Sequence, residues 1–165
     1  MAAGSTYTPI ATTTTSGSAT SYTFTSIPST YTDLIVVCNV AADVSTSVQI
    51  QVGNGSADTG SNYSWTYVLG NGSTAVSGRA SNSTYYLAGD LTGSPSTGIT
   101  QIFNYANTTT NKTVIARGAA AGLNTYATVG LWRSTAAINT VKVFLETPRY
   151  FLDGSKITLY GIASA

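Results

Sequence analysis

The chain has no histidine, one cysteine and few charged residues, and each shortage removes a class of function. Charged residues make up 8% of the 165 positions, against about 25% in a typical soluble domain. Histidine is the commonest proton-transfer group near neutral pH and a frequent metal ligand, so its absence disfavours most acid–base and metal chemistry. The single cysteine excludes an intrachain disulfide and a two-cysteine redox or metal site. We therefore expect no catalytic activity, no cofactor and no metal site.

Nucleic-acid and membrane binding also lack support in the sequence. The seven basic residues are scattered and the formal net charge is +1, so no cluster of positive charge could neutralise a run of phosphates. No apolar run approaches the ~20 residues of a membrane-spanning helix. The N-terminus lacks the basic and apolar regions of a signal peptide. We expect synthesis in a cytoplasm and no nucleic-acid or membrane partner.

Threonine, serine, asparagine, glycine and tyrosine fill the chain instead, in patterns typical of β-strands. Ser47–Val52 alternates apolar and polar side chains, as a half-buried antiparallel strand does. Leu34–Cys38 is apolar on both faces, which predicts a central strand and a buried thiol at Cys38. The expected strands are Ser21–Ile27, Asp33–Ala41, Ser47–Val52, Ser64–Leu69, Thr84–Leu87, Ile99–Tyr105, Thr113–Arg117, Ala127–Trp132, Thr140–Glu146 and Lys156–Ile162. Turn dipeptides such as Asn71-Gly72 separate them. The sequence predicts an all-β, single-domain antiparallel β-sandwich, jelly-roll-like.

The first twenty residues differ from the rest. The run from Thr12 to Ser18 cannot bury a core side chain, yet it is uncharged and permits a β-strand. This segment is either a frayed terminus or an extended N-terminal arm that adds to the sheet edge of a neighbouring subunit. We expect the arm over residues 1–20 and the sandwich over residues 21–165. The candidate inter-subunit contacts of the arm are Tyr7, Pro9, Ile10, Thr13 and Thr15.

The carboxylates give little reason to expect an active site. Asp58, Asp90 and Asp153 each lie beside a turn residue, where hydrogen bonding to the local backbone explains them. Glycoside hydrolysis would need two carboxyl groups facing each other across a cleft. A polysaccharide depolymerase is therefore disfavoured.

Three aromatic residues alternate along one strand and should share a face. They are Tyr63, Trp65 and Tyr67. Such a row can form a platform on which a sugar stacks, or it can belong to the core or to a subunit interface. Both interpretations remain open from the sequence, with core or interface favoured.

Several segments together resemble small virion proteins of tailed phages, especially those of cyanobacteria and other aquatic bacteria. The segments that carry the resemblance are Tyr7–Ile10, Thr12–Thr15, Ser26–Leu34, Asp58–Ser64, Asn104–Thr109, Gly130–Arg133 and Ile157–Ile162. Their order along the chain is more specific than any one of them. The resemblance implies a virion structural protein, on the capsid or on the tail.

Three features favour the capsid. The chain is one compact domain without the coiled-coil or shaft segments of fibre proteins, it has a candidate arm, and the resemblance implies a trimeric β-structure of the kind common among capsid cement proteins. The near-zero net charge is consistent with dense assembly. We expect a non-catalytic capsid decoration (cement) protein, located on the capsid surface of the virion. Its expected partners are itself, as a homotrimer, and the major capsid protein. The alternative is a tail-fibre or receptor-binding tip that recognises host surface glycans through the three aromatic residues.

Overall fold

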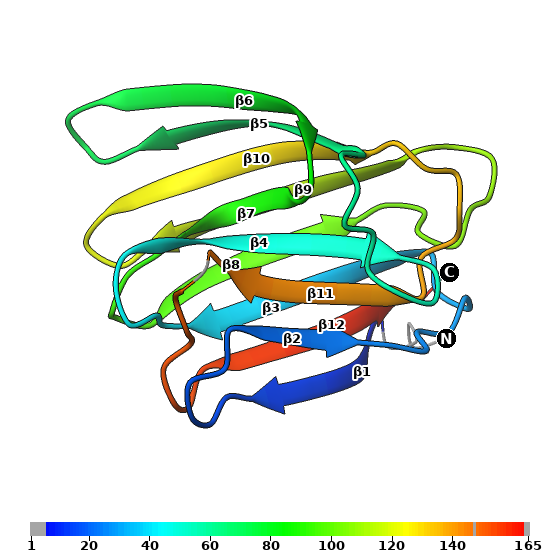
Figure 1. The fold of residues 1–165 in the computed structure, drawn as a ribbon, viewed down its shortest axis with the longest axis horizontal. Coiled ribbons are helices and arrows are strands. Elements are labelled where there is room, and N and C mark those ends of the chain that lie inside the picture. The colour runs from blue at the N-terminus through cyan, green and yellow to red at the C-terminus, as the bar shows by residue number, and fades with distance from the viewer. Residues whose placement is uncertain (1–5, 147, 164–165) are drawn as a thin grey trace, which may run out of the picture.

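Twelve β-strands form two antiparallel sheets that pack face to face, as the computed structural model shows for residues 6–146 and 148–163 (Figure 1). The strands are β1 (Tyr7–Thr14), β2 (Ser21–Phe24), β3 (Asp33–Val40), β4 (Thr46–Gly53), β5 (Tyr63–Gly70), β6 (Ala75–Ser83), β7 (Tyr86–Leu91), β8 (Ser96–Ile102), β9 (Lys112–Ala120), β10 (Asn124–Trp132), β11 (Thr140–Leu145) and β12 (Lys156–Ile162). The large sheet has eight strands in the order β1-β12-β3-β8-β9-β10-β5-β6, and the small sheet has four in the order β2-β11-β4-β7. The predicted all-β sandwich is confirmed. In this described part of the chain, no helix is long and apolar enough to cross a membrane.

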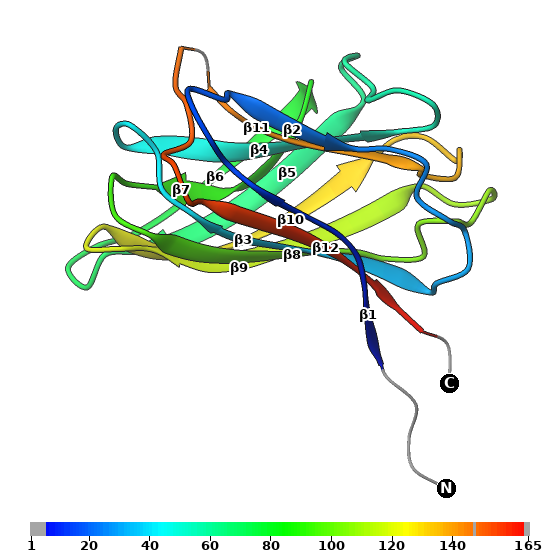
Figure 2. The same cartoon turned by 90° about the horizontal axis from the view of Figure 1, so that it is seen from below.

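The chain changes sheet at most of its connections. From β2 onward it alternates between the small and the large sheet, except at the β5–β6 hairpin and the β8–β9–β10 meander, which stay in the large sheet. This alternation is compatible with a jelly roll extended by additional strands of the large sheet. Figure 2 shows the two layers edge-on, with β1 and β12 nearest the viewer.

The core fills the space between the sheets with aliphatic and aromatic side chains from both inner faces. Val36 and Leu159 of the large sheet and Ile50 and Val143 of the small sheet are each fully buried. Burying a side chain of this size stabilises the fold by roughly 1.5–3 kcal/mol. The alternation of apolar residues predicted these positions because successive side chains of a strand point to opposite faces.

The sheets have unequal widths. β7, the edge strand of the small sheet, lies over β9 and β10, so β5 and β6 extend past it (Figure 1). The inner faces of β5 and of part of β10 therefore have no strand of the small sheet directly above them. This geometry leaves a concave face beside β7.

Tyrosine rings lie over glycines on this side of the molecule. Tyr126 of β10 is paired across the ladder with Gly118 of β9, and its ring also reaches Gly89 of β7. A Cβ atom at Gly89 would overlap that ring, and Gly89 has a φ of 130°, a conformation that favours glycine. These glycines therefore set how closely β7 approaches the large sheet.

Each of the ten predicted strands overlaps a strand of the structure, and two strands were not predicted. β6 (Ala75–Ser83) has small polar residues without alternation, and β1 lies within the segment expected to be an arm. Both are edge strands of the large sheet. An edge strand buries few side chains, so its sequence carries a weak hydrophobic signal.

Candidate functional site

The N-terminal segment is paired with its own chain. β1 lies antiparallel to β12, with an irregularity in register between Pro9 and Ala11. The candidate arm residues differ in their surroundings: Tyr7 is 53% exposed, Pro9 is exposed, and Ile10 packs partly against the core. Thr13 is paired with Ile157. Whether this strand also exchanges onto another copy stays a prediction.

Residues 15–20 are hydrogen-bonded to the sandwich. Thr15 is 3% exposed and its hydroxyl donates to the carbonyl oxygen of Leu152 at 2.5 Å. The carbonyl oxygens of Ala19 and Thr20 also accept backbone hydrogen bonds from the chain near β11. The part of the N-terminus whose strand pairing is with β12 alone is therefore β1, which ends at Thr14, six residues before the boundary expected at residue 20.

The three alternating aromatic residues Tyr63, Trp65 and Tyr67 differ in how far they are buried. Tyr63 is fully buried, and its hydroxyl donates to the carbonyl oxygen of Val52 at 2.9 Å and accepts from the Val52 amide at 3.1 Å. Burial raises the pKa of Tyr63. Tyr63 therefore belongs to the core and cannot contact a ligand, whereas Trp65 and Tyr67 are partly exposed on the concave face.

Trp65 and Tyr67 belong to a larger aromatic row that joins the two sheets. Their ring centroids are 6.0 Å apart, and Trp65 also stacks on Tyr85 at 6.4 Å with an interplanar angle of 26°. Tyr85 meets Phe144 of β11 edge-on at 6.2 Å, and Lys142 Nζ lies 5.0 Å from the Phe144 ring centre. The sequence did not indicate Tyr85 or Phe144 as members of this aromatic row, because no sequence period links residues on different sheets.

Asp58 is part of a hydrogen-bonded turn, as its neighbours predicted. Oδ1 accepts from the Gly60 amide at 2.8 Å, and Oδ2 accepts from the Asn62 side-chain amide at 2.9 Å. A third partner was not foreseen: Trp132 Nε1 donates to Oδ2 at 2.7 Å. Three donors, from Gly60, Asn62 and Trp132, therefore meet the Asp58 carboxylate, and all three hydrogen bonds serve the fold.

The other carboxylates are dispersed. Asp90 accepts from the side-chain amide of Asn124 at 2.8 Å, Asp33 accepts from Gln101 at 2.9 Å, and Asp43 lies 3.7 Å from Arg149. Within residues 6–146 and 148–163, no three of the histidine, cysteine, aspartate and glutamate side chains gather as metal ligands could. Cys38 is buried, and burial raises the pKa of its thiol to about 12.

The outer face of the large sheet is the broadest surface with an unusual character. Residues that alternate with the core positions of six adjacent strands form it: Thr158, Tyr160, Ile35, Val37, Ile99, Gln101, Ile115, Arg117, Ala127, Val129, Thr66 and Val68. Among these twelve, Arg117 carries the one formal charge. Val129 and Val68 are 53% and 57% exposed. A solvated sheet face is ordinarily polar, so exposed aliphatic side chains here indicate a contact surface.

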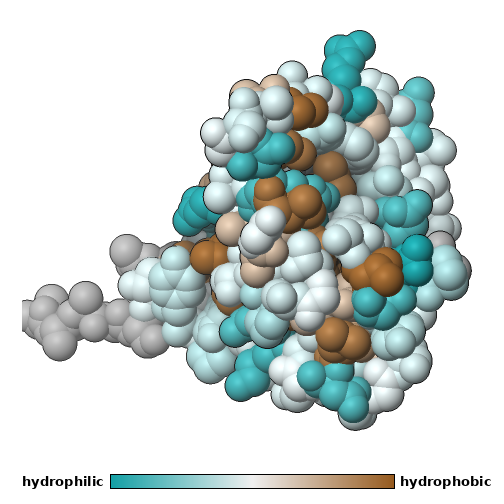
Figure 3. Space-filling view, turned by 90° about the vertical axis from the view of Figure 1, so that its left-hand side faces the viewer, coloured by the Kyte–Doolittle hydropathy of each residue, from teal (hydrophilic) through white to brown (hydrophobic). Residues whose placement is uncertain are grey.

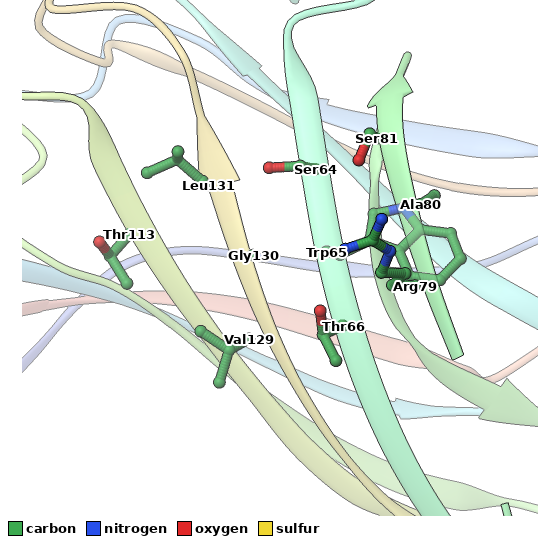
Figure 4. A pocket seen from close by; sticks show the side chains of 10 residues that line it. All are labelled: Ser64, Trp65, Thr66, Arg79, Ala80, Ser81, Thr113, Val129, Gly130 and Leu131. Atoms are coloured by element: carbon green, nitrogen blue, oxygen red, sulfur yellow. The ribbon is translucent and has the colours of Figure 1, made fainter. Parts of the chain in front are cut away.

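A shallow hollow of about 350 Å³ lies on this outer face, over β9, β10, β5 and β6. Figure 4 shows Val129 and Leu131 of β10 beside Ser64 and Thr66 of β5, with Thr113 on the strand beyond. The lining combines hydroxyl groups with aliphatic side chains. Arg79 of β6 is the one charged residue of the lining. The shallow shape and the exposed aliphatic side chains suit contact with another protein surface.

Comparison with known proteins adds no assignment. No protein-family model matches the chain, and no curated protein is similar to it.

Proposed function

We propose that this protein is a non-catalytic structural protein of a tailed-phage virion, a capsid decoration protein that bridges neighbouring capsomers. The observation that carries the proposal is the outer face of the large sheet, which has few charges and exposes Val68 of β5 and Val129 of β10. Contact surfaces deplete charge at their core, as this face does. The resemblance to small phage virion proteins supports the same role.

The proposed mechanism is burial of neutral surface, with no chemical step. The outer face would seat the protein on the capsid, and the β1 edge would join it to sister subunits in a homotrimer. An edge strand held on one side offers unpaired backbone groups to a neighbour. Both contacts would stabilise the capsid by adding noncovalent contacts between capsomers. The protein is then located on the capsid surface.

The test compares two charge insertions in the purified full chain. Val129→Glu places a carboxylate on the outer face, where Val129 is 53% exposed, whereas Thr23→Glu places one on the solvent side of the small sheet, where Thr23 is exposed. We expect Val129→Glu to lower occupancy on capsids lacking the protein by at least about tenfold, because a buried unpaired charge costs more than 1.4 kcal/mol. Thr23→Glu should bind like the unmodified chain. Equal occupancy of the two variants would contradict an outer-face contact.

Glycan recognition at a tail tip is the second candidate. A separate observation favours it: Trp65 and Tyr67 are partly exposed on the aromatic concave face beside β7.

A further inference from the structure

A groove of about 240 Å³ lies between the edge strand β7 and the concave inner face of β5 and β10. Trp65 and Tyr67 form its aromatic wall, Leu87 and Asp90 come from β7, and Thr128 comes from β10. The groove exists because β5 extends past the small sheet, as Figure 1 shows. Viewed from the end that carries the β5–β6 turn, hydrophobic residues lie in separate patches from the top of the view to its lower right (Figure 3).

Two buried polar atoms in this groove have no partner among the described residues. They are the indole Nε1 of Trp65 and the hydroxyl oxygen of Thr128, whose residue is 3% exposed. Buried polar groups in folded proteins are nearly always hydrogen-bonded. Nearby, Asp90 Oδ2 accepts from Asn124 Nδ2, while Asn124 Oδ1 is itself buried and unpartnered. The residues that line the groove therefore combine flat aromatic surfaces with two buried polar atoms that have no partner among the described residues.

The charge of the groove narrows the class of ligand. Its lining holds no lysine or arginine, and Asp90 is its one ionisable acid, so a phosphate or carboxylate group would meet repulsion. A volume below the usual 300–1,000 Å³ of drug-sized sites fits one ring. A sugar ring has apolar faces, which can stack on the aromatic wall, and hydroxyl groups at its edge, which can hydrogen-bond to the unpaired polar atoms.

We propose that the groove between β7 and β5–β10 binds one neutral sugar ring, packed against Trp65 and Tyr67 and hydrogen-bonded by the Trp65 indole and the Thr128 hydroxyl. The proposal goes beyond the assembly function and holds whether the protein sits on the capsid or on the tail. The outer face and the groove lie on opposite faces of the large sheet, so the two properties can be tested separately.

The two tryptophans allow a direct test on the full chain, with glucose, galactose, mannose, N-acetylglucosamine and their β-1,4-linked disaccharides as probes. Each indole N–H gives one signal in a ¹⁵N-correlated NMR spectrum. Trp132 Nε1 is already bonded to Asp58, so its signal is an internal control. We expect at least one probe to shift the Trp65 signal in a saturable manner while the Trp132 signal stays in place. If no probe shifts the Trp65 signal at up to about 100 mM, where Kd values in the millimolar range are detectable, the proposal is wrong.

Thr128→Val tests the polar contact without disturbing the fold. The Thr128 hydroxyl has no partner in the part of the chain that the structure describes, so valine of the same shape should retain stability. We expect it to weaken sugar binding by roughly 5- to 10-fold, the effect of one lost hydrogen bond. The matched control is Thr125→Val, on the same strand but exposed on the outer face, which should bind sugar normally. Equal affinity of the two variants would overturn the assigned site, and normal capsid occupancy of Thr128→Val would show that the groove and the assembly surface are independent.

Discussion

The indole Nε1 of Trp132 donates a hydrogen bond of 2.7 Å to Oδ2 of Asp58, a residue 74 positions earlier in the chain. The contact joins the end of β10 to the connection between β4 and β5. Trp132 is 3% exposed, so its N–H would be unsatisfied in the core without this carboxylate. The pair explains why an acid occurs in this turn of a chain with so few acids.

Replacing Asp58 by asparagine should destabilise the protein. Asparagine replaces one carboxylate oxygen by an NH2 group. That group would face at least one of the three N–H donors that now bind the carboxylate, so at least one hydrogen bond would be lost. We expect a loss of roughly 1–3 kcal/mol in the free energy of unfolding, measured by urea denaturation. Asp153→Asn, in an exposed turn, is the control and should change stability by less than about 0.5 kcal/mol.

The same carboxyl group should make stability depend on pH. Partial burial raises the pKa of Asp58, but hydrogen bonds from Trp132, Asn62 and the Gly60 amide outweigh it and hold the pKa below the usual range. Because the folded pKa lies below the unfolded one, this stabilisation is complete above the usual aspartate range and is lost as pH falls through the folded pKa. Urea titrations between about pH 2 and pH 6 should show a smaller acid loss in Asp58→Asn. An identical pH profile in both proteins would rule out this linkage.

Gly89 should tolerate no side chain. A Cβ there would overlap the ring of Tyr126, in addition to the strain of its positive φ. We expect Gly89→Ala to cost at least about 3 kcal/mol in unfolding free energy. Gly72→Ala is the matched control: its φ is also positive, at 89°, but its Cβ would enter open space, so only about 1 kcal/mol should be lost. Similar losses in both variants would show that the ring contact is unimportant.

Cys38 should be inert in the folded protein. Burial raises the pKa of its thiol to about 12, so the reactive thiolate is scarce near neutral pH. We expect no reaction with a thiol-specific disulfide reagent until urea unfolds the chain, and then one equivalent per chain. Rapid reaction under native conditions would mean that β3 opens locally.

Two truncations distinguish the role of β1 from that of the following residues. Deleting residues 1–14 removes an edge strand that is paired with β12 alone, so the sandwich should stay folded while trimer formation or capsid occupancy falls. Deleting residues 1–20 also removes the buried Thr15 and the carbonyl groups of Ala19 and Thr20. It should lower the thermal midpoint further. Unchanged mass in solution and unchanged occupancy after the shorter deletion would count against β1 as an inter-subunit contact.

The sequence predicted the strands that bury side chains and missed those that do not. Alternation at Ser47–Val52 and the apolar run Leu34–Cys38 identified β4 and β3 because packing imposes a period of two on the sequence. β6 was not predicted because its residues are mostly exposed and therefore show no hydrophobic alternation. Asn71-Gly72 was correctly placed at a turn, where Gly72 has a positive φ.

The surfaces that matter for function were harder to predict. Alternation placed Tyr63, Trp65 and Tyr67 on one face but could not show that the small sheet covers Tyr63 and ends before Tyr67. That difference depends on the relative widths of the two sheets, which local sequence does not encode. The partnership of Asp58 with Trp132 and the aromatic row through Tyr85 and Phe144 are likewise products of tertiary packing.

The most direct test of the central proposal is to add the purified protein to preassembled phage capsids that lack it and to measure the bound mass per capsid. The account predicts saturation at a fixed ratio to the major capsid protein, with bound protein on the outer surface. Failure to bind capsids, together with adhesion to host cells, would contradict a decoration role and place the protein on the tail.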